Sequence, residues 1–193
     1  MNINKLTQLF TKLALITSVV GVSAFATVPA RAENYGNMGN MKMSASNKNL
    51  VEVAVASNSF NTLVKAVQAA GLADTLANGS FTVFAPTDQA FNDSLPQGAV
   101  AFLLKPENKD LLRQVLSYHV TKGKVTSNQL QTGTVNMLYG GVAVRVTPGK
   151  VVVNNASVTN ANIGASNGVI HAVNRVLLPQ QLRQTIASKL AMQ

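Results

Sequence analysis

The sequence predicts an α+β fold, with helices in the first half of the folded domain and strands in the second. Two observations carry this prediction. Apolar residues follow helical spacing over most of the domain up to about residue 120, and after Gly123 the pattern changes to that of strands. Helices and strands that are segregated along the chain in this way favour an α+β domain over an alternating, parallel βαβ architecture.

The opening of the chain, residues 1–32, is predicted to be a secretory signal peptide. Lys5 and Lys12 come before an uncharged apolar run over 13–26, and a small-x-small cleavage site ends at Ala32. The alternative is an uncleaved membrane anchor, but the run is shorter than the ~20 residues that a spanning helix needs. The mature chain is therefore expected to be exported, to the periplasm or the extracellular space, without stable insertion in a membrane.

A flexible linker is predicted over residues 33–48, which are rich in Asn, Gly and Met and have no apolar periodicity. Met38, Met41 and Met43 stand close together in it. Because thioethers select Cu(I), one hypothesis is that this segment binds Cu(I). The alternative is a tether in which the methionines are incidental, since three thioethers alone bind weakly.

The folded domain is expected to span residues 49–183. Its clearest helix has apolar residues at i, i+3, i+4 and i+7, namely Phe60, Leu63, Val64 and Val67. A side chain among residues 57–59 can cap the start of this helix, and Gly71 is placed to end it.

A strand and two further helices are predicted next. Residues 81–84 are apolar on both faces, which favours an interior strand. Pro86 breaks this strand, and Thr87 is placed as the N-cap of a helix that contains Phe91. The Pro-Glu pair at 106–107 opens the following helix, because proline and an acid suit a first helical turn.

The second half is predicted to begin its strands with a hairpin. Residues 142–147 alternate between apolar and polar, Pro148-Gly149 forms a turn, and residues 151–153 return. Asn, Ser and Gly punctuate residues 154–168.

A long strand and a tail are predicted to complete the chain. Residues 169–178 are apolar on both faces, which indicates a central strand, and Pro179 ends it. A terminal helix through Leu182, Ile186 and Leu190 is expected to follow, and we set the boundary of the terminal helix or tail at residues 184–193.

Three segments together resemble the fasciclin domain family. Residues 81–91 (FTVFAPTDQAF) are similar to its first signature block, and residues 118–120 (YHV) to its central Tyr-His motif. Residues 167–179 (NGVIHAVNRVLLP) are similar to its second block. One departure is Asn174, where aspartate is the commoner residue of the family. The order and spacing of the three segments agree with the family over residues 49 to about 183.

The resemblance implies a wedge in which a β-sheet core is overlaid by helices that come mainly from the first half of the domain. It also implies secreted or surface-attached proteins that act in cell adhesion and matrix association, with no catalytic residue and no cofactor. In animal relatives the Tyr-His motif is linked to adhesion, so Tyr118 and His119 carry over as candidate partner contacts.

The remaining motif residues are interpreted as architecture, because helix caps and an apolar core account for them. These structural residues are Phe84, Pro86, Thr87, Asp88, Phe91, His171 and Asn174. His119 and His171 are the two histidines of the chain. They could form a pH switch or a metal site, but the alternative is a pair of buried imidazoles that are hydrogen-bonded to backbone.

Composition excludes several function classes. The net charge is +9, but the lysines and arginines are scattered singly without aromatic interleaving, which disfavours nucleic acid as a partner. The absence of cysteine excludes thiol catalysis and cysteine-ligated metal sites. No G-x-S-x-G motif is present.

Three functions remain. The first is an adhesion or matrix-binding module whose partner is a cell-surface polysaccharide or protein. The second is a periplasmic carrier of a small apolar or lipid ligand, which requires an internal pocket. The third is a hydrolase, which requires a turnover that depends on His119 or His171. We favour the first, although the sequence does not name the ligand.

Overall fold

The computed structural model describes residues 47–192. The predicted signal peptide, most of the predicted linker and the three clustered methionines lie outside the described residues. The helices are α1 (Leu50–Ala56), α2 (Asn61–Ala70), α3 (Ala73–Asn78), α4 (Asp88–Ser94), α5 (Ala99–Leu103), the short 3-10 helix η1 (Pro106–Asn108), α6 (Lys109–Ser117) and α7 (Gln180–Ala191). The strands are β1 (Phe81–Pro86), β2 (Val120–Lys122), β3 (Gly133–Asn136), β4 (Gly141–Thr147), β5 (Lys150–Val153), β6 (Ala156–Ala165) and β7 (Gly168–Val173).

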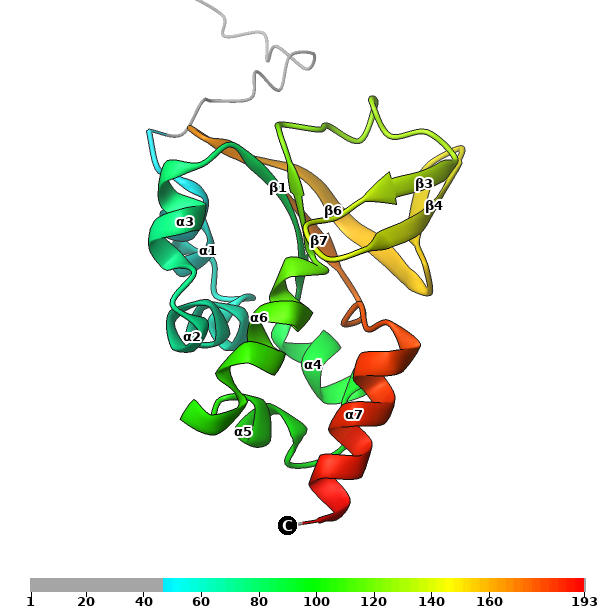
Figure 1. The fold of residues 1–193 in the computed structure, drawn as a ribbon. Coiled ribbons are helices and arrows are strands. Elements are labelled where there is room, and N and C mark those ends of the chain that lie inside the picture. The colour runs from blue at the N-terminus through cyan, green and yellow to red at the C-terminus, as the bar shows by residue number, and fades with distance from the viewer. Residues whose placement is uncertain (1–46, 193) are drawn as a thin grey trace, which may run out of the picture. The chain divides into compact units, whose positions relative to one another are not determined.

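The strands form one seven-stranded sheet in the order β2-β1-β7-β6-β5-β4-β3. The pair β1 and β7 runs parallel, and the other neighbouring pairs run antiparallel. Two register shifts interrupt the pairing of β6 with β7. Such irregularities bend a strand and increase its twist, and Figure 1 shows the sheet curling so that β3 and β4 turn away from β1. The predicted α+β class is confirmed, with most helices preceding most strands.

Two clusters of buried apolar residues lie on opposite faces of the central strands. The helical core joins α1–α7 to one face of β1 and β7, where Val83, Ala85, Ile170 and Ala172 point. The strand core lies on the other face, and its members are Phe84, Tyr118, Leu130, Met137, Val142, Val144, Val153, Ala156, Val173 and Leu177. Because both faces of β1 and β7 are covered, apolar side chains point to both faces of these strands, as the sequence predicted, and Thr82 and His171 are their polar exceptions.

Helix α2 is confirmed, but its predicted N-cap is wrong. Gly71 ends the helix in the left-handed conformation at φ +68°, as expected. At the other end, the capping position falls on Phe60, and no side chain from residues 57–59 bonds to the first helical N–H groups. The carboxylate of Asp88 takes that role instead, because the fold brings α4 against the start of α2.

The second half of the domain departs from the sequence prediction at β6 and β7, whereas its terminal helix agrees with the prediction. The punctuated segment 154–168 contains β6, whose polar side chains obscure the strand pattern. Strand β7 ends at Val173 rather than at residue 178, because Asn174 bonds back to Ser157 at both its backbone N–H and its side chain. Helix α7 begins at Gln180 and contains Leu182, Ile186 and Leu190, the residues of the predicted terminal helix.

The first half also holds three helices that the apolar pattern did not separate, namely α1, α3 and α5. The apolar segment at residue 50 is helix α1, which opens with a capping box between Asn49 and Glu52. Helix α5 consists of five residues, too few for a periodic stripe to appear in the sequence.

Candidate functional site

His119 fastens helix α6 to the segment that follows β7. Its Nδ1 lies 2.8 Å from the carbonyl oxygen of Val115, and its Nε2 lies 2.8 Å from the backbone nitrogen of Leu177. The carbonyl can only accept and the N–H can only donate, so the imidazole carries its proton on Nδ1. Burial lowers the pKa of His119 to about 4, although the bond to Val115 opposes the shift. The ring is therefore neutral at physiological pH, with both nitrogens in use.

Tyr118 ties together two exposed turns of the strand half. Its hydroxyl donates to the carbonyl oxygen of Gly141 and accepts from the side-chain amide of Asn154, at 3.1 Å in each case. Gly140, at φ +78°, passes close to the tyrosine ring. Tyr118 thereby supports the turn that joins β3 to β4 and the turn that joins β5 to β6.

His171 lies on the face of β7 that is turned toward the strand core, and its side chain bonds to the segment 123–130. Its Nε2 donates to the carbonyl oxygen of Val125 at 2.9 Å, and its Nδ1 accepts from the backbone N–H of Asn162 at 3.3 Å. Its ring stacks on Phe84 with 5.3 Å between ring centroids. Burial lowers the pKa of His171 as well, against the effect of the bond to Val125.

Thr82 holds the same segment from β1. Its hydroxyl donates to the carbonyl oxygen of Gly123 at 2.7 Å and accepts from the N–H of Val125 at 2.8 Å. Asn162 adds two bonds to Ser127, one to its backbone N–H and one to its hydroxyl. We call Thr82, Asn162 and His171 the polar clasp. These side chains were not assigned a joint role from the sequence, because they meet only when β1 and β6 both pair with β7.

The first signature block supplies helix caps and core. Thr87 is the N-cap of α4 and accepts from the N–H of Ala90, as predicted. Asp88 accepts from the N–H groups of Asn61 and Thr62. Burial acts to raise the pKa of Asp88, but the hydrogen bonds from those two residues outweigh it and hold the pKa below its ordinary value.

Two apolar residues and a proline complete that block. Phe84 is fully buried between the two histidines, with its N–H bonded to the carbonyl oxygen of His119 and its ring stacked on His171. Phe91 belongs to the helical core. Pro86 ends β1 opposite Val173 and is buried there.

The second signature block contains a contact between β7 and the helices α1 and α3 that was not predicted from the sequence. The side-chain amide of Asn167 donates to carbonyl oxygens at the end of α3, and its oxygen accepts from the N–H of Leu50. Gly168 follows it where an added Cβ would collide with the carbonyl oxygen of Phe81 and with Leu50. The Asn-Gly pair therefore docks α1 and α3 onto the start of β7. At Asn174 an amide oxygen accepts from Ser157, a bond that aspartate would also make.

The described chain offers little for catalysis or metal binding. Within residues 47–192, no group of three His, Cys, Asp or Glu side chains is placed to hold a metal ion. His119 and His171 have both ring nitrogens engaged with backbone groups. In the same part of the chain, no helix has the length and apolar character needed to cross a membrane.

Surface features surround Tyr118. The turn between β3 and β4 exposes Leu138 and Tyr139, at 43% and 37%. An open groove of about 540 Å³ lies between the β5–β6 turn and the start of α7, and its lining residues are Tyr118, Asn154, Asn155, Leu178, Pro179, Gln180, Arg183 and Gln184. By contrast, two apolar cavities in the helical core hold only about 30 and 40 Å³.

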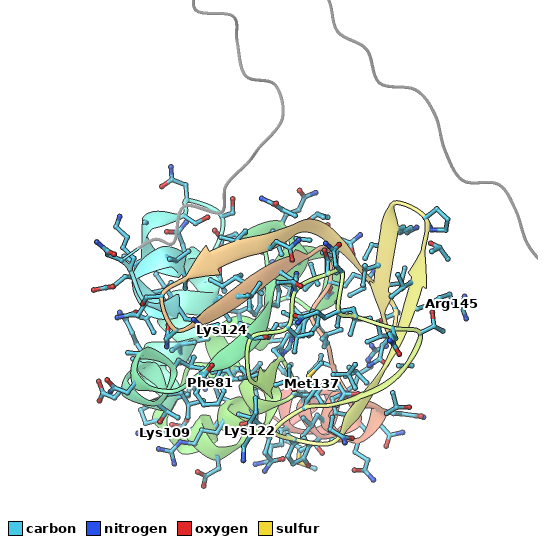
Figure 2. All side chains as sticks on the ribbon, turned by 90° about the horizontal axis from the view of Figure 1, so that it is seen from above. Phe81, Lys109, Lys122, Lys124, Met137 and Arg145 are labelled. Carbon is cyan, nitrogen blue, oxygen red and sulfur yellow. The ribbon has the colours of Figure 1, made fainter. Side chains whose placement is uncertain are left out.

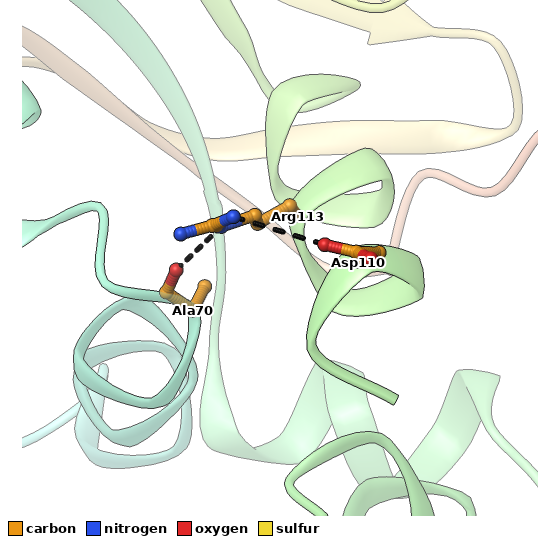
Figure 3. A network of polar contacts seen from close by, with 3 residues as sticks. All are labelled: Ala70, Asp110 and Arg113. Atoms are coloured by element: carbon orange, nitrogen blue, oxygen red, sulfur yellow. Dashed lines mark hydrogen bonds and ion pairs between the residues drawn. The ribbon is translucent and has the colours of Figure 1, made fainter. Parts of the chain in front are cut away.

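Charge is divided unevenly between the two halves of the domain. Every Asp and Glu of the described chain precedes Leu111, whereas basic residues continue to its end. Among the basic residues after that point in the described chain, Arg113 is the one that forms an ion pair. Its Nη1 lies 3.7 Å from Oδ1 of Asp110, and its Nε donates to the carbonyl oxygen of Ala70 (Figure 3). Lys122, Lys124 and Arg145 are spread over the strand half (Figure 2).

Comparison with known proteins identifies the family. The fasciclin domain model matches residues 58–179. A Synechocystis protein, sll1483, is 52% identical over 132 residues, which cover 67% of this chain and 73% of that protein. A second Synechocystis protein, the uncharacterized sll1735, is 44% identical over 133 residues, which cover 67% of this chain and 97% of it.

A solved structure agrees in fold. The FAS1 domain pair of the insect cell adhesion molecule fasciclin I superposes with a TM-score of 0.60 and 17% sequence identity, covering 70% of this chain and 52% of the pair. The matched model, the Synechocystis relatives and this fold likeness agree with one another. The chain belongs to the fasciclin domain family.

Proposed function

We propose that the chain is an exported, non-enzymatic binding module that attaches to cell-surface or extracellular-matrix material. The relevant surface is the one around Tyr118, which comprises the β3–β4 turn, the β5–β6 turn and the adjoining groove. The observation that carries this proposal is the pair of hydrogen bonds at the Tyr118 hydroxyl, which donates to the carbonyl oxygen of Gly141 and accepts from the side-chain amide of Asn154. Through them a buried motif determines the shape of an exposed surface.

Tyr118 and His119 act by positioning in this account. Their side chains are 6% and 2% exposed, so they offer almost no area to a partner. Leu138 and Tyr139 are exposed instead, and their backbone N–H groups bond to Val120 and Ser117, the residues on either side of the Tyr-His pair. The solved relative is described as a cell adhesion molecule, which supports the same class of function.

Two observations favour binding over the alternatives. The hydrolase considered from the sequence needs His119 or His171 free to exchange protons with a substrate, and both imidazoles are buried with both ring nitrogens hydrogen-bonded. A carrier of apolar ligands needs an internal pocket of about 300 Å³ or more. The apolar cavities of about 30 and 40 Å³ fall well below that size.

The test measures retention of the purified protein on cell-envelope and exopolysaccharide fractions of its own organism, at low and at high salt. We expect retention that survives high salt and that falls in Leu138→Ser and Tyr139→Ala. Val55→Ser is the matched control, because Val55 is also an exposed apolar side chain, at 57%, but lies on α1. Equal loss in Val55→Ser and Leu138→Ser, or no retention of the unaltered protein, would contradict the proposal.

Export has its own test. If residues 1–32 are a signal peptide, the protein recovered outside the cytoplasm begins at Glu33, which N-terminal sequencing determines. A chain that is recovered uncleaved from the cytoplasm would contradict this part of the proposal.

A further inference from the structure

We propose that the groove beside Tyr118 binds an acidic sugar unit of a polysaccharide, with Arg183 holding the carboxylate of that sugar. This inference rests on the proposed function and names the class of ligand that the surface accepts. It depends on the lining of the groove, on the unsatisfied side chains around it and on the distribution of charge.

The groove has the size and the lining of a sugar site. Its volume of about 540 Å³ lies within the range of about 300–1,000 Å³ that small-ligand sites occupy. Leu178 and Pro179 are half-buried and give it an apolar floor. Amide side chains and one guanidinium make up most of its rim. A sugar ring presents apolar C–H faces and polar hydroxyl edges, which match such a floor and rim.

The rim side chains are free to bind a ligand. Asn155, Gln180, Arg183 and Gln184 are exposed, and within the described residues none of their side chains forms a hydrogen bond or ion pair. Three amides and a guanidinium therefore surround one groove with their donors and acceptors unused. Asn154 differs, because Tyr118 and the N–H of Ala143 hold its side chain in place. It fixes the β5–β6 turn and so positions Asn155.

The charge of the surroundings favours an anion. The groove is built from residues 118–184, and no Asp or Glu occurs anywhere after Asp110. An approaching carboxylate therefore meets no acidic side chain in the lining of the groove, and within residues 47–192 no carboxylate lies within ion-pair distance of Arg183. A guanidinium binds a carboxylate through two parallel hydrogen bonds, which gives direction as well as attraction.

The same surroundings argue against a purely diffuse interaction with any polyanion. The basic residues of the strand half stand apart, as Figure 2 shows for Lys122, Lys124 and Arg145. Separated exposed charges are screened beyond about 8 Å at physiological salt. Arg183 combines a positive charge with a groove of about 540 Å³ and with free amides. Arg175 also lines a groove, of about 390 Å³, but the carboxylate-bearing Asp93 lines that groove as well, which disfavours an anion there.

Calorimetric titration of the full-length chain with trigalacturonate tests the inference, and its methyl ester provides the matched neutral ligand. We expect Arg183→Gln to weaken binding of trigalacturonate by about ten-fold or more, the effect of losing a charge-assisted hydrogen bond. Lys189→Gln is the control, because it makes the same charge change on the same helix away from the groove. Lys189→Gln should bind within about two-fold of the unaltered chain, and the methyl ester should bind about ten-fold more weakly than the acid.

Three outcomes would overturn the inference. Equal weakening by Arg183→Gln and Lys189→Gln would mean that only net charge matters. Equal binding of trigalacturonate and its methyl ester would show that the carboxylate does not contribute to binding. Absence of trigalacturonate binding would remove the acidic sugar, while retention on envelope fractions would still support the proposed function. Gln184→Ala tests the groove without a change of charge. We expect it to bind trigalacturonate more weakly than the unaltered chain, and unchanged binding would count against the site.

Discussion

The helical core and the strand core differ in what holds them. In the helical core, apolar side chains such as Leu63, Phe91 and Ile170 pack with one another over many elements. The strand core has fewer apolar members, and the polar clasp fixes its segment 123–130 through side-chain hydrogen bonds. His119 stands between the two and joins α6 to Leu177.

This difference predicts that the apolar and the hydrogen-bonded residues of the two cores tolerate substitution differently. Apolar packing tolerates exchange of one apolar side chain for another of similar volume, at a cost of usually less than about 1.5 kcal/mol. A buried hydrogen bond has no such substitute, because removing one partner leaves the other unpaired. The motif residues Thr82, His119 and His171 are therefore expected to be less replaceable than Leu63 or Ile170.

The largest effect is expected for His119→Ala. The substitution removes a buried side chain and leaves the N–H of Leu177 without an acceptor, so the free energy of unfolding should fall by about 4 kcal/mol. Urea denaturation measures this change. His119→Gln keeps a side-chain oxygen for the N–H of Leu177 and should lose less. Equal loss in both variants would mean that volume alone matters at this position.

Acid should weaken the domain through the same residue. The pKa of His119 is about 4 in the folded state and about 6.5 in the unfolded chain. Because the folded pKa is depressed, the stability that the neutral ring contributes is complete above pH 6.5 and is lost as the pH falls toward 4. The loss from pH 7 to pH 4 should be about 3 kcal/mol from His119, with a further loss in the same direction from His171. In His119→Gln, urea midpoints across this range should show the smaller dependence; the same slope in that variant would contradict the assignment.

Thr82→Val tests how much the hydrogen bonds of the polar clasp contribute to stability, because valine keeps the shape of the threonine side chain and lacks only its hydroxyl. The carbonyl of Gly123 and the N–H of Val125 would lose their partners, at a cost of about 2 kcal/mol. Hydrogen exchange should rise first in residues 123–130. Thr134→Val on β3 is the control, since Thr134 is exposed. A stability unchanged in Thr82→Val would show that the polar clasp is dispensable.

Asp88→Asn should have a smaller effect. The carboxylate caps α2 from a distance in sequence, and an amide retains one acceptor, so a loss of about 1 kcal/mol is expected in thermal or urea unfolding. Asp93→Asn on the same helix is the matched control, because Asp93 is exposed and forms no ion pair in the described chain. A larger loss in the control would contradict the capping role.

The helical core could be predicted from the sequence more fully than the strand core. Apolar spacing indicated α2 and the interior strand β1, and Gly71 marked the end of α2. The position of β6 was not predicted, because its asparagines and two register shifts break the period-2 pattern.

The candidate site could likewise be predicted only in part. The motifs indicated that Tyr118, His119 and His171 matter, and the interpretation of buried imidazoles bonded to backbone agrees with their contacts. The partners could not be predicted, because Val125, Asn162 and Leu177 reach the histidines only through sheet pairing. The groove was missed for the same reason: Asn155 and Arg183 come from different elements and share no motif.

Retention on envelope polysaccharide, measured for two folded variants under conditions where both remain native, tests the central claim that buried motif residues build the domain and the surface around Tyr118 does the binding. Thr82→Val alters the polar clasp and should be retained as strongly as the unaltered protein. Leu138→Ser alters the exposed β3–β4 turn and should lose retention without loss of stability, since its side chain is 43% exposed. Loss of retention in folded Thr82→Val together with full retention of Leu138→Ser would contradict the account.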